Sequence, residues 1–175
     1  VICGYIIGSK QGFMYIRGEY PESIDITNEA SSKLSELNLL GENILGTGFD
    51  FDMNVVEGQG AYICGEETAL IASIEGRRAE VDVRPPFPVV EGLYKKPTVV
   101  NNVESLAAVA TIFKLGSDSY KAIGNGRSLG TKLMSLDGHS NNPGLHEVDL
   151  GTPLRTIIDD IGGGFNEDIK AIQIG

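Results

Sequence analysis

Two kinds of apolar pattern alternate along the first part of the chain. Residues 12–20 are rich in aromatic and β-branched side chains, and residues 51–56 alternate apolar with polar side chains, so both segments predict strands. Residues 22–40 carry apolar side chains at helical spacing, with Gly41 positioned to end the helix. Residues 66–75 predict another helix. Strands that alternate with helices predict an α/β domain.

Prolines and a pair of asparagines mark the next part of the chain. The prolines of residues 85–88 fix their own φ angles, so we expect this run to be extended. Asn101 is positioned as a helix N-cap, with Glu104 three residues on as in a capping box. The apolar stripe within residues 103–113 predicts the helix that follows, and Gly116 ends it.

After residue 116 the pattern changes to short strands around one helix. Gly, Ser and Asn are frequent in residues 117–130, which predicts a linker. Thr152 is positioned to cap the helix, and Pro153 suits its first turn. The predicted order is strand, strand, helix and strand, over residues 131–136, 145–150, 152–161 and 169–174. This order is typical of a small β-grasp (ubiquitin-like) α+β domain.

The chain therefore divides into an α/β part over residues 1–116, a linker over 117–130 and a β-grasp domain over 131–175. It starts without Met inside a predicted helix, and it stops directly after a predicted strand. We therefore expect an internal segment of a longer protein.

The charge and the cysteines exclude several classes of function. A formal net charge of −10 without a basic patch argues against nucleic-acid binding. No segment is long and apolar enough to insert into a membrane. Cys3 and Cys64 lie far apart, which suits a reducing cytosol, and without Cys-x-x-Cys spacing they predict no metal or iron–sulfur ligands. We expect His139 and His146 to be exposed.

A glycine-rich turn that opens a helix, residues 58–68, carries the candidate chemistry. Such a turn suits anion binding because the backbone can approach a ligand and the helix amides point outward. Ile63 stands where the Gly-x-Gly-x-x-Gly dinucleotide fingerprint needs glycine, which disfavours an ordinary Rossmann site. On composition alone, Glu66 and Glu67 are first-turn acids that stabilise the helix dipole. The alternative is that their carboxylates accept hydrogen bonds from a cofactor.

Two long motifs resemble those of the NADH-binding flavoprotein subunit of respiratory complex I. They are GQGAYICGEETALIASIEG from residue 58 and RPPFPVVEGLYKKPTVVNNVES from residue 84. The same family includes diaphorase subunits of NAD(P)-reducing hydrogenases and of NAD-dependent formate dehydrogenases. The resemblance extends to YIRGEYP from residue 15 and NILGTGFDF from residue 43, and forward into the β-grasp part. It implies a partial, non-Rossmann FMN-binding α/β domain followed by a soluble ligand-binding β-grasp domain.

The resemblance also implies the site residues. Around FMN we expect Tyr62, Gly65, Glu66, Glu67, Val100, Asn101 and Asn102. We expect NADH to contact Glu67 and to stack its adenine on Phe87, although Phe87 as a plain core anchor is the alternative from the residues alone.

Several residues near these motifs have simpler interpretations. Asn101 cannot use one amide oxygen freely for both a cap and a flavin contact. Cys64 is expected to be a packed thiol rather than a redox group. Surface roles are favoured for Arg77, Arg78 and Arg84, with the phosphates on the adenosine side as the alternative.

In this family, FMN accepts a hydride from NADH, and electrons leave singly through iron–sulfur clusters. The resemblance therefore implies an oxidoreductase with FMN and NAD as cofactors. Its [4Fe–4S] cluster is ligated by cysteines beyond residue 175, and its glycine-rich phosphate loop lies before residue 1. Other subunits of a redox complex are the expected partners, in the cytoplasm and peripheral to any membrane. The alternative is a non-catalytic binding or assembly module of a hydrogenase or formate dehydrogenase complex.

Overall fold

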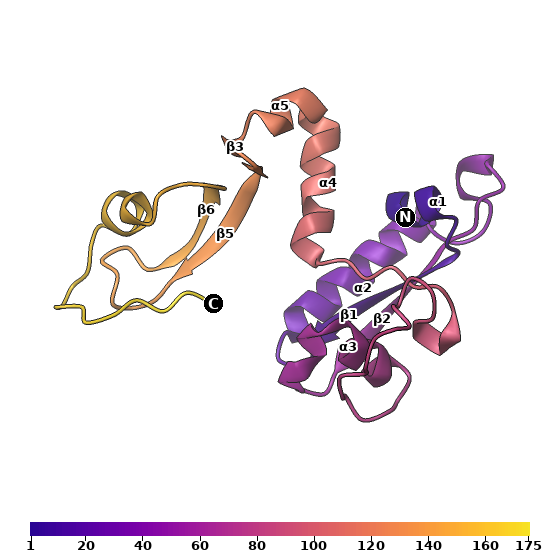
Figure 1. The fold of residues 1–175 in the computed structure, drawn as a ribbon. Helices are drawn as coiled ribbons and strands as arrows, with labels where there is room; N and C mark the ends of the chain where they lie inside the picture. Colours follow the sequence, from indigo (N-terminus) through magenta and orange to yellow (C-terminus); the bar gives the residue numbers. More distant parts are fainter. The chain divides into compact units, whose positions relative to one another are not determined.

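The computed structural model describes residues 1–175 as two compact units, residues 1–100 and 101–175, and each is described here by itself (Figure 1). Both units mix helices and strands. The first unit contains three α-helices, two strands and three short 3₁₀ helices: α1 (Ile2–Ile7), β1 (Gln11–Arg17), α2 (Pro21–Glu36), η1 (Ile44–Gly46), β2 (Asp52–Gly58), η2 (Tyr62–Gly65), α3 (Glu67–Ile74) and η3 (Leu93–Lys95). These elements confirm the two predicted strands and the two predicted helices of this part.

Strands β1 and β2 lie side by side and run parallel, from Gln11 opposite Asp52 to Arg17 opposite Gly58 (Figure 1). Parallel neighbours need a crossover connection, which α2 supplies. Successive side chains of a strand point to opposite faces, so each face of this pair meets a different helix. Met53 packs, with Leu34 of α2, against a buried cluster of Leu40, Ile44 and Phe51. On the opposite face, Tyr15 reaches Ser73 of α3.

Helix α2 ends at Glu36, so the predicted end at Gly41 is wrong. Asn38 adopts a left-handed φ of 54°, which asparagine tolerates better than most residues. Leu39 N–H donates to Leu34 O (2.8 Å) and Asn38 N–H donates to Ser35 O (3.0 Å), the two bonds of a Schellman motif. Gly41 instead forms a bridge with Phe51.

The chain after α3 has little regular structure. Gly76 adopts a left-handed φ of 75° and closes α3, as predicted. The proline run does not continue straight, because the backbone bends at residues 84–86. Two backbone bonds then fold the segment back: Val90 N–H donates to Phe87 O (2.8 Å), and Thr98 N–H donates to Pro88 O (2.8 Å).

The second unit begins with helical segments and ends with a hairpin and a π-helix. Its elements are α4 (Val103–Leu115), α5 (Ser117–Lys121), β3 (Gly124–Asn125), β4 (Ser128–Leu129), β5 (Thr131–Leu136), β6 (Gly144–Asp149) and η4 (Thr156–Ile161). The predicted linker over residues 117–130 therefore holds a short helix and a small antiparallel pair. By its contacts α4 belongs to the second unit. The predicted domain limits at residues 116 and 131 stay a prediction.

Asn102, not Asn101, is the N-cap of α4. The Asn102 side chain accepts a hydrogen bond from Glu104 N–H (2.8 Å). The predicted capping box is wrong because the Glu104 carboxylate accepts from Leu133 N–H (3.0 Å) and pairs with Lys132.

Strands β5 and β6 pair antiparallel, from Thr131 opposite Asp149 to Leu136 opposite Gly144, as the sequence predicts. The predicted helix is also present, but its turns over residues 156–161 are π-helical. Thr152 does not cap it, since its hydroxyl donates to Asp149 O (2.7 Å).

The predicted third strand, residues 169–174, is absent, and the chain there is irregular and exposed. Apolar alternation favours a strand, but a strand also needs a neighbour for its backbone groups, and no neighbour pairs with this segment. His139 is exposed as expected, whereas His146 is half-buried. No helix is long and apolar enough to cross a membrane.

Candidate functional site

The glycine-rich turn leaves the end of β2 and leads through η2 into α3. At Gly58 an added Cβ would lie 2.7 Å from Tyr15 Oη and 2.8 Å from two ring carbons, so only glycine fits against this phenol. Gly60 adopts a left-handed φ of 83°, which redirects the chain toward η2. Tyr15 Oη lies 3.0 Å from Ser73 Oγ, which joins β1 to α3 beneath the turn. Burial raises the pKa of Tyr15, so its phenol stays protonated.

Glu66 is the N-cap of α3. Its Oε2 accepts hydrogen bonds from Thr68 N–H (2.9 Å), Ala69 N–H (3.0 Å) and the Thr68 hydroxyl (2.5 Å). The Thr68 hydroxyl bond, together with the two backbone bonds and nearby Arg84, holds the pKa of Glu66 below its usual value although burial acts in the opposite sense. The other carboxylate oxygen, Oε1, is buried without a hydrogen-bond partner. A carboxylate oxygen in that state can accept a bond from a ligand.

Arg84 pairs with both predicted glutamates. Its Nη1 lies 2.6 Å from Glu67 Oε1, and its Nη2 lies 3.5 Å from Glu66 Oε1. The sequence favoured a surface role for this arginine. The structure shows that it instead offsets the negative charge of the paired acids. Arg78, with a side chain 88% exposed, fits the surface role.

A depression of about 580 Å³ opens beside the turn. Its walls are mainly aromatic and aliphatic, with one carboxylate and one guanidinium: Tyr15, Arg17, Ala61, Tyr62, Ile63, Cys64, Gly65, Glu66 and Leu70. This volume lies within the range of small-molecule sites, about 300–1,000 Å³. Arg17 does not offer a free charge there, because it pairs with Glu19 at 2.6 Å.

The structure brings three of the predicted FMN residues, Tyr62, Gly65 and Glu66, to this depression. Tyr62 is 90% exposed, so its ring is accessible at the rim. Glu67 is adjacent and points to Arg84. Cys64 is buried with its Sγ 4.0 Å from Ala69 O, which confirms the predicted packed thiol.

Within the first unit, Val100 and Phe87 do not line the depression. Val100 is half-buried at the end of the first unit. Asn101 and Asn102 belong to the second unit, so their approach to the turn stays a prediction. Phe87 is 54% exposed, which makes it a poor core anchor and leaves its ring accessible for stacking.

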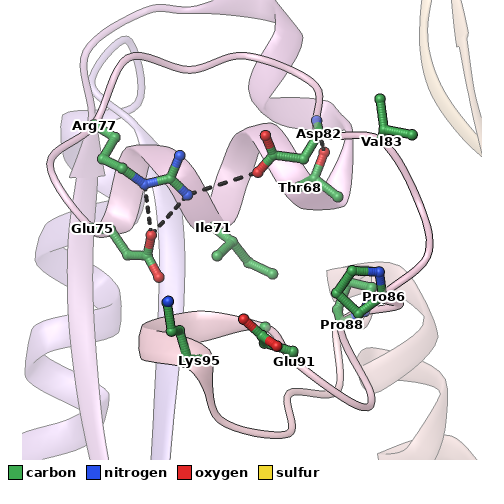
Figure 2. A pocket seen from close by; sticks show the side chains of 11 residues that line it. Thr68, Ile71, Glu75, Arg77, Asp82, Val83, Pro86, Pro88, Glu91 and Lys95 are labelled. Carbon is green, nitrogen blue, oxygen red and sulfur yellow. Dashed lines mark hydrogen bonds and ion pairs between the residues drawn. The ribbon is translucent and has the colours of Figure 1, made fainter.

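A second pocket, of about 350 Å³, lies between α3 and the irregular segment that carries Phe87 (Figure 2). Pro86 and Pro88 form part of its wall. Its polar side chains are mostly paired: the Arg77 guanidinium lies 2.8 Å from Glu75 Oε2 and 3.8 Å from Asp82 Oδ2. Among the described residues, no cluster of acids, histidines or cysteines could hold a metal ion.

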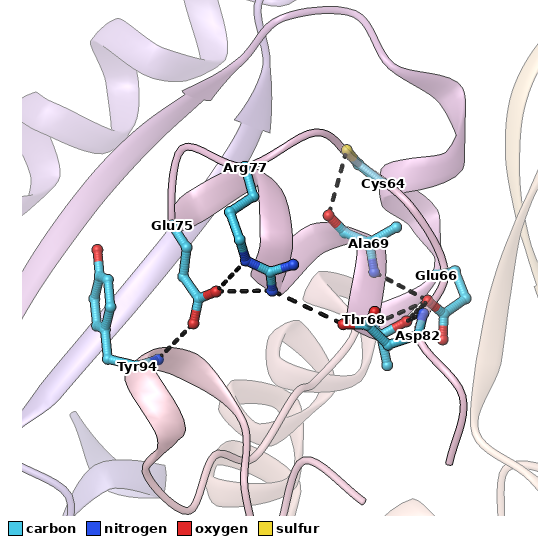
Figure 3. A network of polar contacts seen from close by, with 8 residues as sticks. All are labelled: Cys64, Glu66, Thr68, Ala69, Glu75, Arg77, Asp82 and Tyr94. Atoms are coloured by element: carbon cyan, nitrogen blue, oxygen red, sulfur yellow. Dashed lines mark hydrogen bonds and ion pairs between the residues drawn. The ribbon is translucent and has the colours of Figure 1, made fainter. Parts of the chain in front are cut away.

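A set of polar contacts links the first turn of α3 to its C-terminal end through the segment that follows the helix (Figure 3). Asp82 N–H donates to Thr68 Oγ1 (2.9 Å), which itself donates to Glu66. Tyr94 N–H donates to Glu75 Oε1 (2.7 Å). Sequence reasoning missed Tyr15, Arg17 and Thr68, although all three stand inside the motifs that carry the family resemblance.

The match that decides the family is to the model of the Nuo51 FMN-binding domain, which covers residues 1–111. The chain belongs to this family. This confirms the resemblance stated from the motifs. The Nuo51 family match includes the glycine-rich turn, α3 and both predicted asparagines.

Individual relatives are similar over nearly the whole chain. The HndC subunit of the NADP-reducing hydrogenase of Solidesulfovibrio fructosivorans is 49% identical over 99% of this chain and 36% of its own length. A subunit of the NADH-quinone oxidoreductase of Aquifex aeolicus is 45% identical over 100% of this chain and 42% of its own length. The chain thus spans well under half the length of these relatives.

A solved structure shares the fold. A chain of an NAD⁺-reducing [NiFe]-hydrogenase in the H₂-reduced state superposes with a TM-score of 0.82 at 33% identity. The match covers 94% of this chain and 27% of that chain. The mixed helix-and-strand fold therefore agrees with that of a hydrogenase chain.

Proposed function

We propose that the chain forms one wall of the FMN site of an NADH-oxidising flavoprotein. The observation that carries this proposal is the buried Oε1 of Glu66, which accepts no hydrogen bond and lies at the wall of an aromatic depression in a chain of an FMN-binding family. Its ion-pair partner, Arg84 Nη2, is 3.5 Å away. The family match favours this function over a module that only joins subunits.

The residues of the depression fit a flavin. Tyr15, Tyr62 and Leu70 offer apolar and aromatic surface to a planar ring system. Glu66 Oε1 accepts no hydrogen bond within the protein, and beside its 3.5 Å ion pair with Arg84 it can accept one from a ribityl hydroxyl or a ring N–H. Space is also available at Gly65, where an added Cβ would meet no atom within 4 Å. FMN, when bound, accepts a hydride and releases electrons one at a time.

This chain's own residues would bind and orient the two ligands. The Thr68 hydroxyl, together with the Ala69 and Thr68 amides, lowers the pKa of Glu66 and so keeps it ionised and fixed as an acceptor. Glu67 accepts bonds from the hydroxyls of NADH, and Phe87 stacks on the adenine. Val100, Asn101 and Asn102 complete the flavin contacts, with the Asn102 side chain also capping α4.

The carboxylates of Glu66 and Glu67 favour NADH because they repel the additional phosphate of NADPH. Arg84 offsets part of that repulsion, since it pairs with both carboxylates. The pairing makes Arg84 the residue whose removal should sharpen the preference for NADH.

The remaining features of the whole protein follow from the same proposal. Electrons pass singly to iron–sulfur clusters, including a [4Fe–4S] cluster outside these residues, and then to other subunits of a cytoplasmic redox complex that is peripheral to any membrane. The α/β part is of a non-Rossmann type, because Ile63 breaks the dinucleotide fingerprint. Strands β5 and β6 with η4 are the strand–strand–helix portion of a β-grasp domain. Nucleic acid is not a partner.

The substitution Gly65→Ala in the full-length protein tests the proposal. The backbone φ at Gly65 is ordinary and its surroundings are open, so alanine should leave the fold intact. The added methyl would occupy flavin space, and we expect the FMN affinity to fall about tenfold or more, the equivalent of one lost favourable contact of ~1.4 kcal/mol. FMN content by absorbance and affinity by flavin fluorescence measure this.

Gly138→Ala is the matched control, because Gly138 also has an ordinary φ and open surroundings but lies in the hairpin turn of the second unit. It should retain the FMN of the unmodified protein. A Gly65→Ala protein that folds and holds FMN with unchanged affinity would remove the turn from the flavin site.

A further inference from the structure

Thr68 sits where the cap of α3 meets the irregular segment that carries Phe87. Its side chain is buried, with only 7% of the residue exposed. The Thr68 hydroxyl donates to Glu66 Oε2 (2.5 Å) and accepts from Asp82 N–H (2.9 Å), so both its donor and an acceptor position are used (Figure 3). One oxygen atom therefore contacts both the flavin-side carboxylate and the nucleotide-side segment.

The segment after α3 has few other attachments to that helix. At the start of the segment, Arg77 N–H donates to Ala72 O. The next backbone hydrogen bond within the segment is the one that Phe87 O accepts. Between these points the Asp82 amide is the backbone group that is bonded to α3. Arg77 and Arg84 also form ion pairs in this region, but their side chains are 52% and 38% exposed. Exposed ion pairs contribute little to fixing the position of a segment.

We infer that Thr68 is a positioning residue. Its hydroxyl fixes the position of the segment that carries Arg84 and Phe87 relative to the Glu66 carboxylate. This inference rests on the proposed function. Thr68 does not line the flavin depression, although it lines the second pocket, and both hydrogen-bonding positions of its hydroxyl are already used by Glu66 and Asp82. We therefore expect it to act through these two residues. Thr68 is buried and its bond to Asp82 is partly buried, so loss of the hydroxyl leaves the Asp82 N–H without its partner in the protein.

The inference separates binding from chemistry. A loosened segment presents Phe87 and Arg84 in many arrangements, so NADH must order them on binding and its affinity falls. Without the hydroxyl, Glu66 still accepts the bonds from the Thr68 and Ala69 amides, so we expect the flavin-side carboxylate to stay in place and electron transfer in the saturated protein to change little. Loss of the Thr68 hydroxyl should therefore raise the KM for NADH and leave kcat nearly unchanged.

The test compares Thr68→Val with Thr68→Ser in the full-length flavin-loaded protein. For Thr68→Val we expect the Asp82 amide to exchange with deuterium about tenfold faster, the loss of one hydrogen bond. The KM for NADH should rise about five- to tenfold with kcat within about twofold, as loss of ordering alone predicts. Thr68→Ser keeps the hydroxyl and should restore both values to within about twofold.

Thr27→Val is the matched control, since the Thr27 hydroxyl only bonds its own helix at Ser23 O (2.7 Å). It should change neither the Asp82 exchange nor the KM. If Thr68→Val does not fold, Asp82→Pro removes the donor instead of the acceptor, and the KM for NADH should then rise by the same five- to tenfold, whereas an unchanged KM would overturn the positioning role.

The outcomes separate the two proposals. Unchanged Asp82 exchange in Thr68→Val, failure of serine to restore it, or faster exchange with an unchanged KM would each overturn the positioning role. A wild-type protein that holds no FMN and oxidises no NADH refutes the proposed function, yet the exchange measurement, which needs no nucleotide, still decides whether Thr68 anchors the segment.

Discussion

Removal of the Glu66 carboxylate should open helix α3 locally. Helix α3 has eight residues, and a helix this short does not persist in water without tertiary support and a cap. Glu66→Ala removes the acceptor of two backbone N–H groups and of one hydroxyl at once. An alanine at an N-cap costs ~0.5–2 kcal/mol.

The magnitude follows from the kind of bond that is lost. Glu66 is ionised, since its pKa lies below the usual value, and bonds to a charged acceptor are roughly twice as strong as neutral ones. We therefore expect the upper part of the range, about 2 kcal/mol, which corresponds to about a 30-fold change in a local opening equilibrium. The amide of Ala72, in the body of α3, should exchange faster by that factor.

Hydrogen–deuterium exchange on the full-length protein measures this effect. The amides of Thr68 and Ala69 should lose nearly all protection, because their acceptor is gone. Glu66→Gln keeps an acceptor oxygen without the charge and should fall between the wild-type and alanine proteins. Equal Ala72 exchange in the wild-type and Glu66→Ala proteins would show that the cap does not stabilise α3.

Two further predictions concern charge near the turn. The Thr68 hydroxyl and the α3 amides lower the pKa of Glu66 in the folded protein, so the carboxylate contributes stability above its unfolded pKa of ~4.3, and this contribution is lost as pH falls through the lower folded pKa. The difference in α3 exchange between wild type and Glu66→Gln should thus shrink below about pH 4.3, and a difference that widens there would contradict the assigned sign. Arg84→Gln should lower the NADPH-to-NADH ratio of kcat/KM, about five- to tenfold for one partly exposed charge, because the paired carboxylates then repel the additional phosphate without compensation. Steady-state rates with both nucleotides test this, and an unchanged ratio would mean that the pair lies away from the adenosine ribose.

The regular elements of the first unit followed from local sequence. Residues 51–56 and 66–75 predicted β2 and α3 because their spacing reflects burial on one face or one stripe. The end of α2 was missed because Asn38, not glycine, takes the left-handed position. The cap of α4 was displaced by one residue because two adjacent asparagines satisfy the same local pattern, and Glu104 finds a partner in Lys132, far along the chain.

The candidate site was only partly predictable. Tyr62, Gly65 and Glu66 were found through a motif, and the structure brings them to one depression. The Arg84 pairing was not predicted, since 17 residues separate it from Glu67 and no local periodicity connects them. The absent strand over residues 169–174 has the same cause: pairing depends on a remote partner, and local alternation carries no information about it.

The close approach of Tyr15 to Gly58 makes these two positions epistatic. A side chain at Gly58 would occupy the space of the phenol, whose oxygen and ring carbons lie 2.7–2.8 Å from the added Cβ. A larger residue at position 58 is therefore compatible only with a smaller one at position 15, and that change also removes the contact to Ser73. Evolution and protein engineering can reach such a variant only by compensating substitutions, so the floor of the proposed flavin site should vary as a coupled pair rather than one residue at a time.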